Sequence, residues 1–158
     1  MLGAGTPVGG LGGVLEYNLA PRFALGAGVG ASWTDGGSLL GSLQVGALGR
    51  FRLALSEGNQ VAQAFDLVGG FSTGHFVYPI FPGDGPSWSG QAYWVQPGLE
   101  YELVTRGGFR FASGIGAAIV AAMSGTSDAA SASSGYVLDD SKLPRLFLTV
   151  DLVIGYAL

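Results

Sequence analysis

The chain has 158 residues and a formal net charge of −4, and only 11% of its residues are charged, whereas about 25% is usual in soluble domains. Its mean hydropathy is +0.42 and it contains 29 glycines, so little charge is available to cover a water-facing surface. No run of about 20 apolar residues exists, which argues against membrane-spanning helices. The seven Lys and Arg residues are scattered, which argues against nucleic-acid binding, and the absence of cysteine excludes disulfides and thiolate metal sites.

Apolar residues alternate with small or polar ones in seven segments, and this period of two is typical of β-strands. The predicted strands cover residues 9–19, 22–34, 39–55, 60–75, 89–104, 109–122 and 145–158. The last segment shows the pattern most clearly, with Leu148, Val150 and Leu152 on one face and Thr149 and Asp151 on the other. We therefore expect one all-β domain covering residues 1–158.

Each predicted strand has an apolar face, which carries no charge, and a mixed face of small, polar and charged residues. Nine charged residues fall on the mixed faces. These residues are Glu16, Arg22, Arg50, Arg52, Asp66, Glu100, Glu102, Arg110 and Asp151. Gly, Ala and Ser dominate the rest of the mixed face, which fits the lumen of a narrow barrel. Because a buried charge without a partner is costly, the nine residues are predicted to form an ion-pair and hydrogen-bond network that fills the lumen.

A sheet that spans lipid can leave no edge unpaired, so the pattern predicts an antiparallel up-and-down transmembrane β-barrel. Short connections at residues 20–21, 56–59 and 105–108 are expected on the periplasmic side, and the other connections on the extracellular side. Aromatic residues lie near both expected rims, as interfacial girdles do, although aromatics also favour strands in general. They are Tyr17, Phe23, Phe51, Tyr101, Phe109 and Tyr156 at one rim, and Trp33, Trp88 and Tyr93 at the other.

The strand count leaves one strand to be found, because bacterial barrels of a single chain have an even number of strands and seven are readable. We expect about eight. The simplest source is an upstream strand that is absent from this chain, preceded by a signal peptide. The alternative is an unrecognised strand within residues 123–142, where the run of Ser, Ala and Asp has little β character.

The Gly-rich alternating strands, the turn Glu-Tyr-Asn-Leu-Ala-Pro-Arg-Phe at residues 16–23 and the alternating hydrophobics of the final strand resemble small OmpA/OmpX-type outer-membrane barrels. The resemblance is one of pattern and covers nearly the whole chain. It implies the outer membrane of a Gram-negative-type bacterium, contact with the lipid bilayer and insertion by the outer-membrane assembly machinery. In that family the last residue is usually Phe, whereas here it is Leu158.

His75 is the only histidine and the weak candidate for catalysis. Some barrels of this class are lipid-modifying enzymes in which a rim Ser/His pair and a carboxylate attack an acyl ester. Ser72 lies three residues away and so faces the opposite side of the strand. Ser87 or Ser89, oriented with Asp84, is the remaining arrangement, and an ordinary rim histidine is the alternative.

Two other patterns have a functional and a structural interpretation. The glycine strings at residues 9–13 and 26–30 lack the strand and helix that a phosphate-binding loop requires, so they are interpreted as small positions within strands. Glu100 and Glu102 face the same way, as paired carboxylates in glycosidases do. Arg50 and Arg52 have the same spacing, which favours salt bridges with these two carboxylates over a catalytic role.

The segment 76–88 is predicted to be an extracellular loop, and Tyr78, Phe81 and Trp88 are its candidate contact residues. The leading hypothesis is a non-enzymatic outer-membrane barrel with a plugged lumen and a structural or surface-contact role. The alternatives are a lipid-modifying acyl hydrolase or acyltransferase, and a soluble lipocalin-like carrier whose apolar face points inward. No cofactor or metal is expected.

Overall fold

The structure is a computed structural model that describes residues 2–4, 11–31, 43–79, 87–127 and 145–156. Within these ranges all regular structure is β-strand, as the sequence predicts. The strands are β1 (Leu2–Ala4), β2 (Leu11–Ala20), β3 (Phe23–Ala31), β4 (Leu43–Glu57), β5 (Val61–Pro79), β6 (Ser87–Thr105), β7 (Phe109–Ser127) and β8 (Leu146–Tyr156). All seven strands predicted from the alternating pattern are present.

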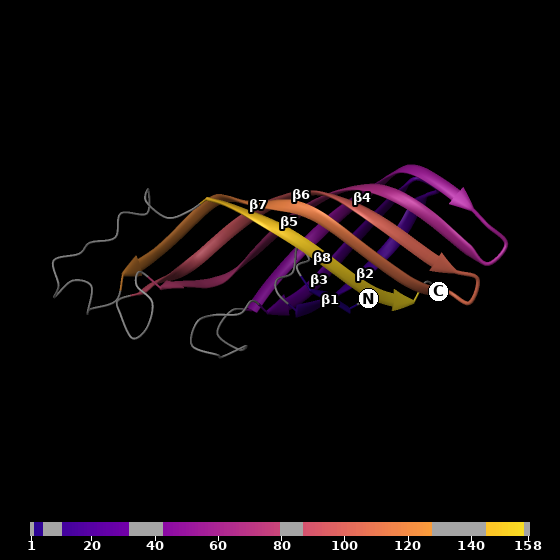
Figure 1. The fold of residues 1–158 in the computed structure, drawn as a ribbon. Helices are drawn as coiled ribbons and strands as arrows, with labels where there is room; N and C mark the ends of the chain where they lie inside the picture. The colour runs from indigo at the N-terminus through magenta and orange to yellow at the C-terminus, as the bar shows by residue number, and fades with distance from the viewer. Residues whose placement is uncertain (1, 5–10, 32–42, 80–86, 128–144, 157–158) are drawn as a thin grey trace.

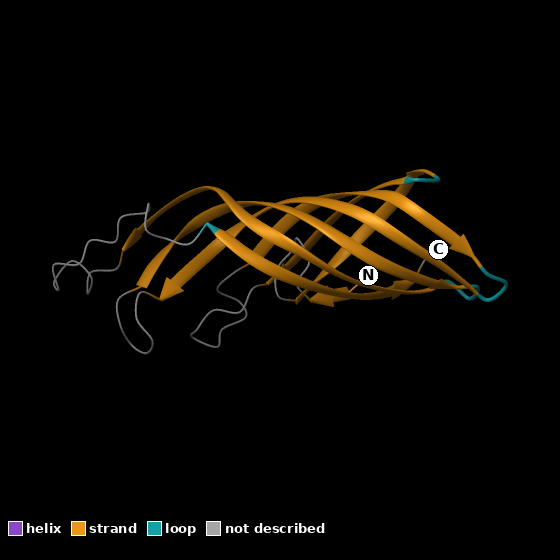
Figure 2. Cartoon of the chain, turned by 45° about the horizontal axis from the view of Figure 1, so that its top comes forward, coloured by secondary structure: helices purple, strands orange, loops and turns teal. Residues whose placement is uncertain are grey.

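Each strand pairs antiparallel with the next in the chain, which gives an up-and-down order (Figure 1). The connections between β2 and β3, β4 and β5, and β6 and β7 are short and lie at one end of the sheet (Figure 2). We call this the turn end. These are the three short connections predicted from the sequence.

The three residues of β1 join the two ends of the strand order. β1 pairs with β2 on one side and with β8 on the other, and Leu2 lies opposite both Gly13 and Ile154. The missing strand was expected upstream of the chain, and β1 takes that place in the strand order at residues 2–4. Of the alternative range 123–142, the described part is the end of β7 and the remainder lies outside the described residues.

The described parts of the predicted loop at residues 76–88, residues 76–79 and 87–88, are strand, and the prediction is wrong for them. β5 continues to Pro79 and β6 begins at Ser87, so Tyr78 and Trp88 lie opposite each other on neighbouring strands. Aromatic residues favour strands, and proline is tolerated at the end of one, which explains why the ladder continues. Phe81, the third predicted contact residue, lies outside the described residues.

The two faces of the sheet carry different side chains, as the alternation predicts. Large apolar side chains on the outer face are exposed on β2 to β8, and Leu15, Leu148 and Val150 are 82%, 89% and 74% exposed. Charged and small side chains alternate with them and are buried on the inner face. The outer face is therefore apolar, and the charges are inside.

Candidate functional site: the charged lumen cluster

The charged residues meet because the strand register brings them to neighbouring levels on the inner face. Arg52 lies opposite Asp66 on β5, and Asp66 lies opposite Glu100 on β6. Since side chains alternate along a strand, Arg50 and Glu102 point inward as well. The inner charges therefore form one cluster near the turn end, which we call the lumen cluster.

Arg50 has the largest number of ion-pair partners in the lumen cluster and its side chain is only 4% exposed. Its Nη1 lies 2.7 Å from Glu100 Oε2 and 3.2 Å from Asp66 Oδ2. Its Nε donates a hydrogen bond of 3.1 Å to Glu16 Oε1, and its Nη2 donates one of 3.1 Å to Glu16 Oε2. This two-point contact is the geometry that suits guanidinium best, because its donors form a rigid fork.

Two further arginines extend the network across the lumen. Arg52 donates to Asp66 at 3.3 Å and to Glu102 at 3.3 Å. Arg110, on β7, donates to the same Glu102 at 2.8 Å and to Glu16 at 3.0 Å. Arg50 Nη1 also lies 3.7 Å from Glu102 Oε2, so Glu102 is shared by three arginines and Glu16 by two. The ion pairs connect β2, β4, β5, β6 and β7.

The structure joins seven of the nine predicted lumen residues by ion pairs and places the other two differently. Asp151 is buried on β8, across Gly114 from Glu100, and its Oδ1 has no hydrogen-bond partner among the described protein groups. Arg22 is exposed in the turn that precedes β3. This position corrects the prediction for Arg22, because the strand begins one residue later than expected.

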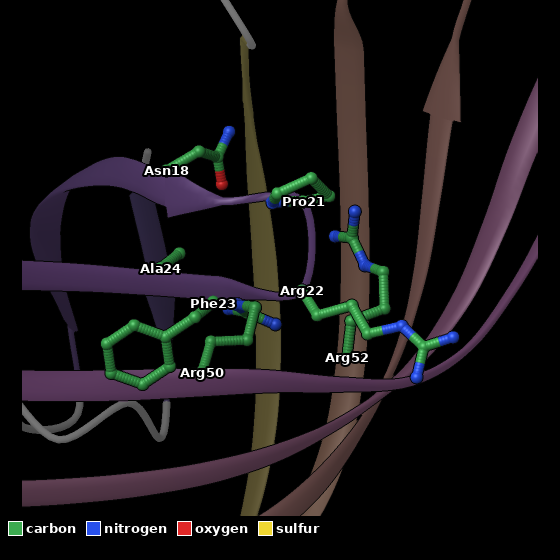
Figure 3. Close-up of a pocket in the computed structure, with 7 residues that line it drawn as sticks. All are labelled: Asn18, Pro21, Arg22, Phe23, Ala24, Arg50 and Arg52. Carbon is green, nitrogen blue, oxygen red and sulfur yellow. The ribbon is translucent and has the colours of Figure 1, made fainter.

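Arg22 contributes to the site through its backbone and through the shape of the lumen mouth. Its carbonyl oxygen accepts a hydrogen bond of 2.8 Å from the backbone N–H of Arg52. Together with Arg52 and Pro21 it lines a small cavity of about 10 Å³ (Figure 3). A second cavity of about 20 Å³ lies between Arg52 and Glu102. Each has room for about one water molecule, so the described lumen is closely filled at this end.

Glycines opposite the carboxylates make room for the cluster. Gly26 faces Glu16 across the β2–β3 ladder, and a Cβ added at Gly26 would lie 2.9 Å from Glu16 Cγ. Gly114 faces Glu100, and a Cβ there would lie 2.6 Å from Glu100 Cγ. The sequence indicates that glycines line the lumen, but the pairing of each glycine with a carboxylate requires the register.

An apolar layer lies on the inner face further from the turn end, and the sequence analysis did not identify it. Trp94 is 5% exposed and packs with Ala92, Ala118 and Val120, against which Met123 and Phe147 also pack. Trp94 is an even-numbered residue on β6, like Glu100 and Glu102, and this parity is the signal that places it inside. We call these six residues the apolar layer.

The candidate catalytic residues do not come together in the described part of the chain. His75 is exposed on β5, whereas Ser72 is fully buried on the opposite face, as their spacing predicts. Ser89 lies opposite Val77 on the ladder, and Asp84 is outside the described residues. The described residues therefore show no nucleophile and base in contact.

The paired carboxylates are held by arginines, which favours the structural interpretation of Glu100 and Glu102. Glu100 accepts a hydrogen bond from Arg50, and Glu102 accepts hydrogen bonds from Arg52 and Arg110.

No group of three His, Cys, Asp or Glu side chains in the described ranges is arranged to bind a metal ion. A search of the same residues finds no helix long and apolar enough to cross a membrane.

Comparison of the chain with protein-family models, with curated proteins and with solved structures finds no match. The likeness to small OmpA/OmpX-type barrels therefore remains a prediction from the sequence pattern.

Proposed function

We propose that this chain is an integral outer-membrane β-barrel with a structural or surface-contact role and a lumen closed by an arginine–carboxylate network. The observation that carries the proposal is the inverted facing of the sheet. Large apolar side chains are exposed on β2 to β8, whereas Arg50, Asp66, Glu100 and Glu102 are buried inside. Water would favour the opposite arrangement.

The size of the exposed apolar face supports a lipid environment. Full burial of one Leu or Val side chain is worth about 1.5–3 kcal/mol, and side chains such as Leu15, Leu148 and Val150 forgo most of this gain in water. An apolar face that continues across neighbouring strands is far more extensive than the patches of ordinary soluble monomers. Acyl chains would cover this face, and the ladder hydrogen bonds would satisfy the backbone groups within the bilayer.

Aromatic residues near the turn end support a membrane boundary there. Tyr17 and Tyr156 are 72% and 64% exposed, and the rings of Phe65 and Tyr101 lie 5.0 Å apart on the outer face. The hydroxyl of Tyr101 donates a hydrogen bond of 2.9 Å to Gln63 Oε1. The side chain thus combines an apolar ring with a hydroxyl that has a partner. Such side chains are typical of the lipid–water interface. On this proposal the turn end is periplasmic.

The lumen cluster supports a closed barrel rather than a general porin. About eight strands leave an interior that side chains can fill, and here the three arginines and their carboxylates occupy it near the turn end. The soluble-carrier alternative requires an apolar interior and external charges, which is the reverse of the observed facing. Insertion by the outer-membrane assembly machinery is part of the proposal.

The test is to express the protein with a secretion signal and to examine the membrane fraction by gel electrophoresis with and without boiling. We expect a species that requires detergent for extraction and changes mobility on boiling, because a closed ladder resists detergent until heated. A protein that stays in the aqueous fraction and shows no change in mobility would contradict the proposal.

A further inference from the structure

Two arginines lie directly opposite each other at the turn end of the β3–β4 ladder. Phe23 lies opposite Phe51, and at the next position the backbone N–H of Arg52 donates a hydrogen bond of 2.8 Å to the carbonyl oxygen of Arg22. Arg22 and Arg52 therefore share one register position, where Cβ atoms are usually about 4.5–5.5 Å apart. Like charges in such a pair are destabilising, so the position favours an anion between them.

The two guanidinium groups have donors left for such an anion. Arg52 uses its Nε for Asp66 and its Nη2 for Glu102, and its Nη1 has no partner among the described groups. Arg22 is exposed, and the ion pairs within the described ranges all belong to Arg50, Arg52 and Arg110. One complete guanidinium and part of a second are thus open at the lumen mouth.

The small cavity at this mouth has a positive lining. Arg22, Arg50, Arg52 and Asn18 contribute to it, and none of its lining residues is a carboxylate (Figure 3). Its volume of about 10 Å³ holds about one water molecule, and hence one oxygen atom of an oxyanion. The remainder of the anion would lie outside the cavity, against the exposed side chain of Arg22.

The geometry of guanidinium selects the class of anion. Its rigid fork of donors suits phosphate and carboxylate oxygens. A tetrahedral phosphate directs its oxygens several ways, so it can contact both arginines while one oxygen enters the cavity. Phe23 lines the same cavity and is 39% exposed on the outer face. A phosphate that carries acyl chains could therefore bind here with its chains along the outer face.

We propose that Arg22 and Arg52 form a phosphate-binding site at the lumen mouth, which takes the phosphate of a phospholipid headgroup or free phosphate. The lipid source rests on the membrane barrel proposed above, in which the turn end meets the periplasmic leaflet. The free-phosphate source does not depend on it. In both cases the bound phosphate relieves the repulsion between the opposed arginines.

The first experiment titrates inorganic phosphate into the protein in a non-ionic detergent and measures the heat of binding. The proteins are the wild type, Arg22→Met and Arg106→Met. Arg106 is exposed in the turn between β6 and β7, so its removal changes the net charge equally and provides a matched control. We expect Arg22→Met to weaken binding about tenfold or more, and Arg106→Met less than about twofold. Equal affinities of the three proteins, or equal losses in the two variants, would overturn the inference.

The second experiment identifies the source of the phosphate by titrating short-chain phosphatidylglycerol and a short-chain glycosyl diacylglycerol without phosphate. Phosphatidylglycerol that binds more tightly than inorganic phosphate, and loses this affinity in Arg22→Met, assigns the site to lipid. Equal or weaker binding than inorganic phosphate assigns it to free phosphate. A wild type that binds neither form of phosphate, or that binds both lipids equally, rejects the site.

The two proposals can fail separately. The change in gel mobility on boiling reports whether the wild type and each variant form the membrane barrel. A protein that proves water-soluble would reject the barrel, and the titration with inorganic phosphate would then run without detergent. A barrel that forms but shows no effect of Arg22→Met on phosphate affinity would reject only the phosphate site.

Discussion

Arg50 connects carboxylates of three other strands through its ion pairs. Its guanidinium contacts Glu16, Asp66 and Glu100 from three other strands, and it is almost completely buried. A buried charge network is costly to assemble, but removal of one member is costlier, since the remaining charges lose their partner. The stability of the fold should therefore depend more on Arg50 than on any surface charge.

Arg50→Met should lower the free energy of unfolding by about 3–5 kcal/mol, because it leaves Glu16, Asp66 and Glu100 with fewer positive partners. Urea titration of the protein in detergent micelles measures the change. Arg22→Met is the control, and its exposed position predicts a change within about 0.5 kcal/mol. Equal effects of the two substitutions would show that the network does not stabilise the fold.

The facing of each charge could be predicted from the sequence, but its partners could not. Alternation alone places Arg50, Arg52, Glu100 and Glu102 on the inner face, and the structure agrees. The partners depend on how far each strand is shifted against its neighbours. The error at Arg22 arose at a strand boundary, where a shift of one residue moves a side chain from the lumen into a turn.

At the scale of the element, the long strands were predictable because one face is uniformly apolar. The sequence failed at residues 76–79 and 87–88, where prolines and glycines suggested a loop although β5 continues to Pro79 and β6 begins at Ser87. It also could not identify β1, whose three residues are too few to show a period of two. Short elements are specified by their partners rather than by their own pattern.

The register between β6 and β7 depends on small residues opposite large ones. A Cβ at Gly114 would lie 2.6 Å from Glu100 Cγ and 2.7 Å from the carbonyl oxygen of Leu99. The side chain of Glu100 could move, but the backbone oxygen could move only with its strand. At Gly69, on the outer face of β5, an added Cβ would meet nothing within 4 Å.

Gly114→Ala should therefore lower the unfolding free energy by about 1–3 kcal/mol through overpacking. Gly69→Ala should be neutral or slightly stabilising, because alanine has less conformational freedom to lose than glycine. Both values come from the same urea titration in micelles. If Gly69→Ala destabilised as much as Gly114→Ala, the cost would belong to glycine in strands generally and not to the contact with β6.

At the scale of the whole molecule, the strand order returns to its start through β1. The described pairs across this seam are Leu2 with Ile154, Gly3 with Val153 and Ala4 with Leu152. The other ladders are much longer, and β5 and β6 pair along their full lengths. Among the described residues, the seam between β8 and β2 therefore has the shortest ladders of the sheet.

A cysteine pair can test this seam directly, because the chain contains no cysteine. Leu2→Cys combined with Ile154→Cys should form a disulfide on mild oxidation, since directly opposed residues have Cα atoms about 4.5–5.5 Å apart. Leu2→Cys with Leu148→Cys is the control, because six residues along β8 correspond to about 20 Å. Non-reducing electrophoresis of boiled samples measures the cross-link, and equal yields would argue against the observed pairing.

The short seam also has a consequence for how fast the protein can assemble. The pairs from β2 to β8 join strands that are neighbours in sequence, so each closes a shorter stretch of chain than the pairing of β1 with β8. The pairing of β1 with β8 joins opposite ends of the chain, and its loop-closure entropy is the largest in the fold. Among the described residues, three pairs between β1 and β8 offset that entropy. Closure is therefore expected to be the last and slowest step of assembly, and to set its half-time.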